Sequence, residues 1–109
     1  MERVSEIVTK IYQKYLPIVK KLDVSLDIDF PDTTLMTSEK SHIEKELDKS
    51  LKNAVSRAHG GHIAISVRPG KIIVTDDGTT LSKAACELLS TEHVKVKSRV
   101  GFGTTVTIK

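Results

Sequence analysis

The sequence contains no tryptophan, and only four aromatic residues, two tyrosines and two phenylalanines, are spread over its 109 positions. Its one cysteine, Cys86, excludes an internal disulfide and a zinc site made of several cysteines. Small and apolar neighbours flank Cys86, which is typical of a small buried side chain rather than of a nucleophile. No apolar run approaches the roughly 18 residues of a membrane-spanning helix, and we expect no signal peptide before the domain. We therefore expect a cytoplasmic, reduced protein whose domain makes no membrane contact.

Charge of one sign does not dominate the sequence either. Lysine and arginine number 17 against 14 acidic residues, which gives a net charge of +3 at pH 7. No basic stripe interleaves with the four aromatic residues, so nucleic-acid binding is not expected. A mild positive excess favours solubility and anionic small molecules. The length fits one domain over 1–109, without a repeat, linker or low-complexity tract.

Hydrophobic periodicity predicts the helices and strands. Apolar side chains recur at helical spacing over 2–22, and a second helix is expected to begin near Ser38 or Ser41 and to end at Gly60-Gly61. Pro69-Gly70 predicts a tight turn in which the glycine takes a positive φ. Alternating segments with helices on one face predict an α+β fold, a two-layer α/β sandwich with a mixed, mostly antiparallel sheet. The expected extended segments are 24–30, 34–37, 62–68, 71–75, 94–96 and 104–108, and a short helix is expected over 82–90.

The helix expected over 2–22 carries a continuous stripe of isoleucine, valine and tyrosine. Pro17 lies inside the pattern and predicts a kink or a split of the helix just before it. Because this helix is longer than the sheet requires, we interpret it as a possible connector, or as a docking surface for a partner or a second copy of the chain. At the start of the second helix, Ser41 and Glu44 fit a capping box.

An acidic corner ends the most apolar strand. The run Ile72-Ile73-Val74 leads into Asp76-Asp77-Gly78-Thr79-Thr80. A buried carboxylate costs free energy unless a donor binds it, so this corner suggests a polar ligand. The alternative interpretation is an ordinary Asp-Gly turn, which is the commonest use of that dipeptide.

Three stretches together resemble one family. They are Leu47-Asp48-Lys49-Ser50-Leu51-Lys52-Asn53-Ala54-Val55, then Ile73-Val74-Thr75-Asp76-Asp77-Gly78-Thr79-Thr80-Leu81, and finally Gly101-Phe102-Gly103-Thr104-Thr105-Val106-Thr107-Ile108. The first is similar to an asparagine box, the second to a first glycine box, and the third to the closing strand of histidine kinases. The chain thus resembles, over nearly its whole length, the GHKL ATPase superfamily of sensor histidine kinases, gyrase B subunits and heat-shock chaperones.

The resemblance implies a site for ATP or ADP. It gives Asn53 the role of holding magnesium, Asp76 that of accepting a hydrogen bond from the adenine amino group, and Gly78 that of letting the backbone pass close to the base. One threonine of the last strand, Thr104 or Thr105, is implied near the adenine, and alternation alone does not choose between them. The alternative interpretation of Asn53 is that it belongs to a solvated polar strip.

The sequence departs from the family pattern in three places. Only residues 82–93 stand where the family inserts a long lid with a second glycine box, so backbone donors for the phosphates are missing. Lys49 stands one helical turn before Asn53, where relatives have an asparagine or a glutamate, and a charged lysine neither ligates magnesium nor acts as a base. Thr80 replaces the second glycine of the box, and a β-branched residue is poorly suited to positive φ.

These departures shape the expected function. Phosphoryl transfer depends on positioning and neutralising phosphates, so we expect an adenine-nucleotide-binding domain of the histidine-kinase type with weak binding that depends little on magnesium. No helical hairpin carries a phosphoacceptor histidine, so a partner protein would supply that histidine or be a response regulator. The alternative is a non-enzymatic interaction or regulatory module, with the helix over 2–22 as a possible homodimer contact. The four histidines are interpreted as surface residues: His42, His59, His62 and His93.

Overall fold

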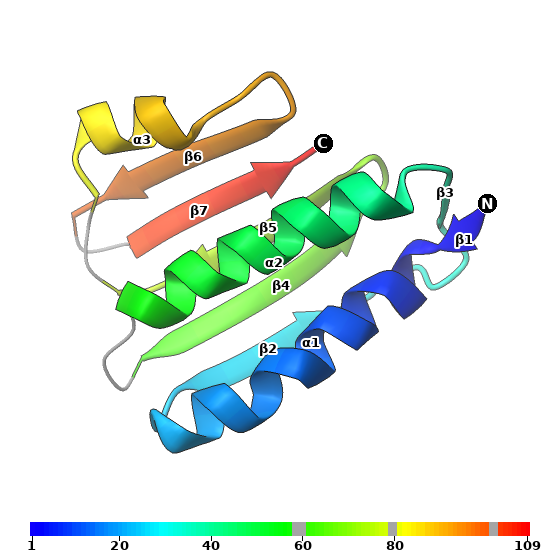
Figure 1. Ribbon diagram of the computed structural model, residues 1–109, viewed down its shortest axis with the longest axis horizontal. Helices are drawn as coiled ribbons and strands as arrows, with labels where there is room; N and C mark the ends of the chain where they lie inside the picture. The colour runs from blue at the N-terminus through cyan, green and yellow to red at the C-terminus, as the bar shows by residue number, and fades with distance from the viewer. Residues whose placement is uncertain (58–60, 79–80, 101–102) are drawn as a thin grey trace.

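The computed structural model describes residues 1–57, 61–78, 81–100 and 103–109. Two long helices lie in front of a twisted sheet, and a short helix runs beside one edge strand (Figure 1). In chain order the elements are β1 (Glu2–Arg3), α1 (Val4–Lys21), β2 (Ser25–Asp29), β3 (Met36–Thr37), α2 (Lys40–Arg57), β4 (His62–Arg68), β5 (Lys71–Asp76), α3 (Lys83–Leu89), β6 (Val94–Arg99) and β7 (Gly103–Ile108). The expected α+β sandwich with helices on one face is confirmed.

The main sheet is mixed, as expected, with the strand order β2-β4-β5-β7-β6. The strand pairs β4–β5, β5–β7 and β7–β6 are antiparallel, whereas β2 and β4 are parallel neighbours. Parallel neighbours need a crossover, and the segment containing β3 and α2 supplies it. This crossover places α2 against the middle of the sheet, where it contacts β5 and β7.

Period-two alternation decides which face of the sheet is buried. Alternate side chains of β4, β5 and β7 turn toward the helices, and their neighbours in sequence lie on the partly open face. The buried row ends in two polar residues, Asp76 on β5 and Thr104 on β7, rather than in apolar ones. The apolar members of this row are Ile63, Ile65, Val67, Ile72, Val74, Val106 and Ile108.

The N-terminal helix α1 is part of the core. Its apolar stripe packs into the same hydrophobic cluster as α2 and the sheet, so the expected use of this stripe as an external docking surface is wrong. Burying the stripe inside the domain accounts for the length of the helix. Pro17 does not split α1, because buried side chains on both sides of it, Tyr15 and Val19, hold the two halves to one core. Residues 2 and 3, expected to be helical, instead pair as β1 with β3.

The start of α2 also differs from the prediction. The helix begins at Lys40, so Ser41 lies inside it and the capping box of Ser41 and Glu44 is wrong. Thr37 ends the preceding strand, and its hydroxyl oxygen accepts a hydrogen bond from the Glu39 amide at 3.0 Å. This contact satisfies a backbone donor just before the first helical turn.

The remaining boundaries fall close to the predicted ones. Gly70 has φ of +74°, as the turn requires, and the Ser82 hydroxyl caps α3 by accepting from the Ala85 amide. Three predictions lie outside the described residues: the helix end at Gly60, the backbone at Thr80, and Gly101-Phe102 before the last strand. In the described part of the chain, no helix combines the length and apolar character needed to cross a membrane.

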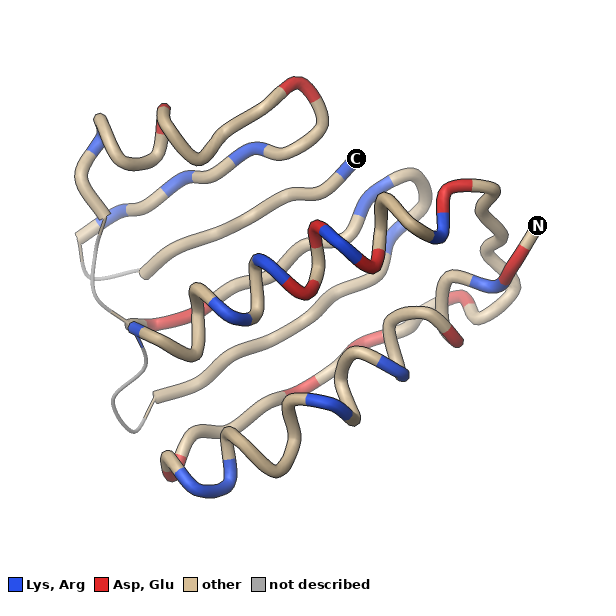
Figure 2. Tube along the Cα trace, viewed as in Figure 1, with Lys and Arg blue, Asp and Glu red and all other residues tan. Residues whose placement is uncertain are grey.

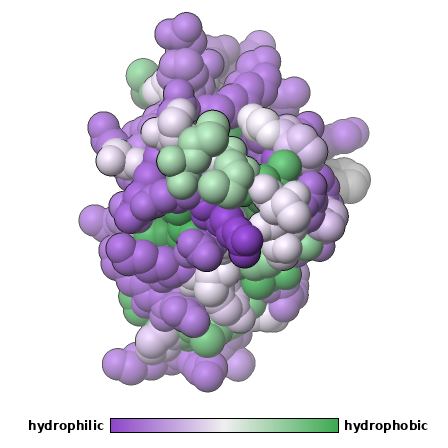
Figure 3. All heavy atoms as spheres, turned by 90° about the vertical axis from the view of Figure 1, so that its right-hand side faces the viewer, coloured by the Kyte–Doolittle hydropathy of each residue, from purple (hydrophilic) through white to green (hydrophobic). Residues whose placement is uncertain are grey.

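The end of the molecule that carries the N-terminus is hollowed. Figure 3 shows apolar atoms recessed among hydrophilic ones on this face. The hollow has a volume of about 180 Å³, and Val4, Leu35 and Ile43 are among the apolar residues that line it. It lies near the β4–β5 turn, which is the opposite end of β5 from Asp76.

Candidate functional site

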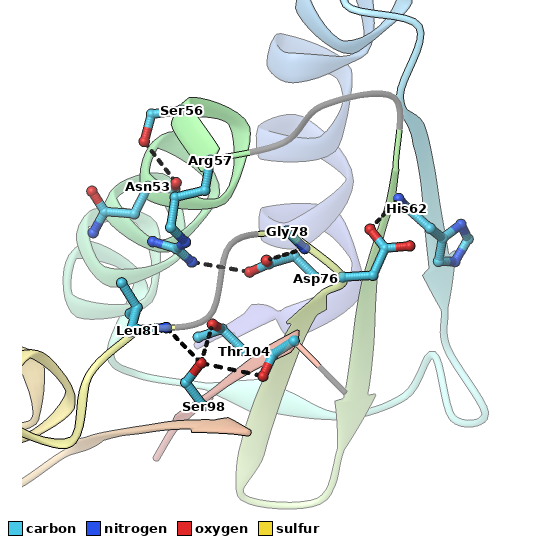
Figure 4. Close-up of polar contacts among 11 residues, drawn as sticks. Asn53, Ser56, Arg57, His62, Asp76, Gly78, Leu81, Ser98 and Thr104 are labelled. Carbon is cyan, nitrogen blue, oxygen red and sulfur yellow. Dashed lines mark hydrogen bonds and ion pairs between the residues drawn. The ribbon is translucent and has the colours of Figure 1, made fainter. Parts of the chain in front are cut away.

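The acidic corner lies where the C-terminal end of α2 meets the ends of β5 and β7. Figure 4 shows Arg57 of α2 reaching toward Asp76, with Thr104 and Ser98 on the adjoining strands. Asp76 pairs with Thr104 across β5 and β7, and Thr104 pairs with Ser98 across β7 and β6. The sheet register therefore sets three polar side chains in one row on the face covered by the helices.

The carboxylate of Asp76 is buried, and its side chain is only 3% exposed. One oxygen, Oδ2, accepts a hydrogen bond from Nη2 of Arg57 at 3.0 Å, and the other, Oδ1, accepts one from the backbone amide of Gly78 at 3.0 Å. The cost of burying this charge is thus offset by groups of the chain itself. An external ligand is not needed to satisfy it, contrary to what the sequence suggested.

Arg57 is itself enclosed and only partly satisfied. Its side chain is 15% exposed. Among the described residues, no hydrogen-bond acceptor reaches its buried Nε. An unpaired buried donor costs about 1–3 kcal/mol, so this guanidinium holds its place with a penalty.

Glycine at position 78 is explained by the approach of α2. A Cβ at Gly78 would lie 3.0 Å from the Arg57 carbonyl oxygen and 3.1 Å from Oδ1 of Asp76. Gly103, with φ of +79°, would bring a Cβ against the backbone of Asp76. The neighbouring Asp77 has a structural role, because its Oδ1 accepts the His62 amide at 2.7 Å and ties β5 to β4.

The structure separates the two candidate threonines. Thr104 is 1% exposed, shares the face of Asp76, and its hydroxyl lies 3.0 Å from that of Ser98. The Ser98 hydroxyl also accepts the Leu81 amide at 2.8 Å, which anchors the segment that follows the corner. Thr105 lies on the opposite face of the sheet, and it lines a groove beside α3. Of the two, only Thr104 lies beside Asp76.

Asn53 faces a cleft rather than open solvent. It lies one helical turn before Arg57, and both line a narrow space between α2, α3 and β6. Four polar residues of α2 line this cleft: Glu46, Lys49, Asn53 and Arg57. The Asn53 side-chain amide makes no hydrogen bond to any described residue. It is available to a ligand, and its backbone carbonyl accepts the Ser56 hydroxyl.

The cleft is nearly closed. Leu81 and Leu89, from the segment that leads into and forms α3, line it as well, and the free volume is about 20 Å³. That volume holds roughly one water molecule. A purine ring enters only if Arg57 or these leucines move. Figure 2 shows acidic and basic residues mixed in the first half of α2, and basic residues alone toward its C-terminal end and along β6.

The polar side chains at this site fit the hydrogen-bonding groups of an adenine better than they fit a metal ion. Asp76 offers a carboxylate acceptor and Thr104 a hydroxyl in a buried row. For magnesium, the cleft offers the Asn53 amide and the Glu46 carboxylate, with the Lys49 cation between them on the helix. In the described ranges no group of three or more histidine, cysteine or acidic side chains is placed to hold a metal.

Sequence reasoning missed two residues of this site. The spacing of four residues between Asn53 and Arg57 is the only sign in the sequence that Arg57 shares the cleft, and nothing in the sequence joins it to Asp76. Ser98 carried no signal, since its hydrogen bonds to Leu81 and Thr104 depend on the register of β6.

No family model matches the chain, and no curated protein matches it. Solved structures do. The catalytic domain of the histidine kinase ThkA, in a nucleotide-free form, has a TM-score of 0.83 at 13% identity and covers 97% of this chain and 92% of its own. The mycobacterial sensor histidine kinase MprB has a TM-score of 0.69 at 13% identity, with 97% and 92% covered.

A third structure contains the histidine kinase ThkA in complex with the response regulator protein TrrA. It has a TM-score of 0.74 at 15% identity and covers 97% of this chain and 39% of that chain. At these identities the likeness shows the fold. The chain has the fold of histidine-kinase catalytic domains, which confirms the structural part of the resemblance drawn from its three sequence stretches.

Proposed function

We propose that this domain binds adenine nucleotides, ATP or ADP, in the cleft beside Asp76. The observation that carries the proposal is the buried row of Asp76 and Thr104, which Arg57 joins to the cleft that it lines together with Asn53, in a fold shared with histidine-kinase catalytic domains. The carboxylate accepts the amino group of the base, and a hydrogen bond to a charged group is worth roughly 1.5–3 kcal/mol.

The same geometry implies weak binding that depends little on magnesium. The cleft has about 20 Å³ of free space, so side chains must rearrange before a purine enters. The segment after the corner forms the short helix α3 rather than a longer lid. Lys49 in the cleft offers a phosphate a point charge but disfavours a metal ion beside Asn53.

The test is a titration of the domain with ADP, followed by amide chemical shifts, with and without magnesium. We expect millimolar affinity, shifts that cluster at Asn53, Asp76–Gly78 and Thr104, and at most a small change with magnesium. Tight, magnesium-dependent binding or measurable ATP hydrolysis by the isolated domain would contradict the weak-binding proposal. Absence of shifts at millimolar nucleotide would contradict nucleotide binding.

A second candidate is a non-enzymatic module that keeps the fold and works through a protein partner. The observation that favours it is the complete satisfaction of both Asp76 oxygens within the chain. In either case the partner is a protein that carries the phosphoacceptor histidine or is a response regulator, by analogy with the ThkA–TrrA complex. Binding of such a partner without any nucleotide response would favour this candidate. Self-association is a separate prediction, checked by the sedimentation of the isolated domain.

A further inference from the structure

We infer that Arg57 is a built-in competitor of the purine, and that the affinity of the site is set by the release of this side chain from Asp76. The inference rests on the proposed function and adds to it a residue that regulates the same site. It starts from the contact between Nη2 of Arg57 and Oδ2 of Asp76 at 3.0 Å, which Figure 4 shows crossing from α2 to the end of β5.

The first step is that Arg57 and a purine compete for one acceptor. Oδ1 of Asp76 accepts the Gly78 amide, and Oδ2 accepts Arg57, which lines the cleft, so a base that enters from the cleft approaches Oδ2. The Arg57 guanidinium and the purine amino group are both N–H donors, and a charged guanidinium is the stronger partner for a carboxylate. Arg57 therefore mimics the contact that the purine would make.

The second step is that they also compete for space. Arg57 lines the cleft together with Leu81 and Leu89, and about 20 Å³ remains. Since this is about the room for one water, a base cannot stack in the cleft while the arginine lies across it. Release of the side chain opens the acceptor and the entrance at the same time.

The third step is that the closed state is poised to open. The Arg57 side chain is 15% exposed, so it has a path to solvent at the end of α2. Its Nε has no acceptor among the described residues, and release to water removes that penalty. A ligand that binds only the open state loses affinity in proportion to the fraction of molecules that are open. A bond of this kind corresponds to an open fraction of about 1–10%.

The experiment compares Arg57→Ala with the wild-type protein and with a matched control, Arg68→Ala. Arg68 also pairs with an aspartate, Asp29 at 2.9 Å, but at the surface and far along the sheet from Asp76. The probes are adenosine and purine riboside, which lacks the 6-amino group. We expect Arg57→Ala to bind both ligands about 10- to 100-fold more tightly, because both enter only the open state, and Arg68→Ala to match the wild type. In each protein purine riboside should bind more weakly than adenosine, because it lacks the amino group that donates to Asp76.

Arg57→Ala leaves a buried carboxylate without its cation, and this variant can fail to fold. Arg57→Gln, which keeps a neutral donor, is therefore measured as well and should show a smaller gain. In the wild-type protein, the side-chain Nε–H resonance of Arg57 should shift as adenosine is added.

The outcomes separate the two claims. If the wild type binds adenosine but neither Arg57 variant binds it more tightly, or the Arg57 resonance is unchanged at saturation, the inference is overturned and the proposed function stands. If the wild type binds adenosine weakly and an Arg57 variant binds it more tightly, both are supported. If no variant binds adenosine at millimolar concentration, the proposed function fails, and with it the inference.

Discussion

Two aspartate clusters tie α2 to its neighbours, and they differ in how well their donors are satisfied. On one side, Oδ1 of Asp48 accepts Lys14 Nζ at 2.7 Å and the Tyr15 hydroxyl at 2.9 Å, which joins α2 to α1. On the other, Asp76 is held by Arg57 and the Gly78 amide. The first cluster is half exposed and its donors are used, whereas the second is buried and contains an unpaired Nε.

The difference separates a structural contact from a site. Lys14, Tyr15 and Asp48 lie over the apolar core between two helices, and nothing beyond the chain is needed there. Arg57 lines a cleft, and its guanidinium binds Asp76 at the end of β5. A charged pair that is buried, incompletely satisfied and placed at a cleft is a candidate for exchange with a ligand.

Removal of each aspartate should give the largest contrast. Asp76→Ala removes two hydrogen bonds to a buried charged group, one from Arg57 and one from the Gly78 amide, so we expect a loss of about 3–5 kcal/mol in the free energy of unfolding. Asp48→Ala breaks an exposed ion pair and one tyrosine hydrogen bond, and about 1–2 kcal/mol is expected. Urea unfolding measures both.

The double variant Arg57→Ala with Asp76→Ala sharpens this result. Removing both charges avoids the unpaired ion, so the pair of changes should cost clearly less than the sum of the single ones. Additive losses would show that Arg57 and Asp76 do not depend on each other.

Much of the fold was predictable because its signals are local. The alternation in 62–68 and 71–75 and the positive φ of Gly70 follow from side-chain periodicity and turn chemistry, and the structure confirms them. The parallel pairing of β2 with β4 and the pairing of β1 with β3 join segments that are distant in sequence, so no local sequence pattern predicts them. The burial of the apolar stripe of α1 in the core likewise depends on tertiary packing, which the periodicity of the stripe does not reveal.

The site was predictable only in part for the same reason. The positions of Asp76 and Asn53 came from motifs, and the structure places Asp76 in a buried row and Asn53 in the cleft. The choice between Thr104 and Thr105 required the register of β5 with β7. The contact between Arg57 and Asp76 depends on how the end of α2 and the end of β5 meet in three dimensions, which the sequence does not reveal. The roles of Asp76, Asn53 and Thr104 in nucleotide binding stay predictions.

Tyr15→Phe tests the structural cluster alone. The change removes the hydroxyl that donates to Asp48 while leaving the buried ring in place, so about 1 kcal/mol of stability should be lost. The affinity for adenosine should not change, because Tyr15 and Asp48 meet between α1 and α2 and neither lines the cleft. A change in affinity would show that the two clusters are coupled through α2.

The pH dependence of stability should carry the signature of the same tyrosine. Burial, together with the hydrogen bond to Asp48 and the charge of that residue, raises the pKa of Tyr15 from 10.0 to about 12. A raised pKa means that the folded state holds the proton more tightly, so this stability is complete below pH 10 and is lost as the pH rises toward 12. Unfolding measured from pH 9 to 12 should be flatter in Tyr15→Phe.

At acid pH the dependence of stability on pH has the opposite sign to that of Tyr15, and its source is Asp48. The hydrogen bond from Lys14 lowers the pKa of Asp48, an effect that burial opposes and Tyr15 reinforces. Stability from this carboxylate is therefore present above its unfolded pKa of 3.8 and is lost as the pH falls below it. Asp48→Asn should weaken this loss of stability at acid pH, measured by urea unfolding as the pH is lowered. If the loss is unchanged in the variant, it comes from other carboxylates.

The smallest effects come from the two threonines, which compare the two faces of one strand. Thr104→Val keeps the shape but removes the hydroxyl that meets Ser98, so we expect about 0.5–1.5 kcal/mol less stability and a several-fold weaker affinity for adenosine. Thr105→Val makes the same chemical change one residue later, on the opposite face, and should leave the affinity unchanged. Equal losses of affinity in the two variants would mean that the base does not lie on the face of Asp76, since strand geometry sends these side chains in opposite directions.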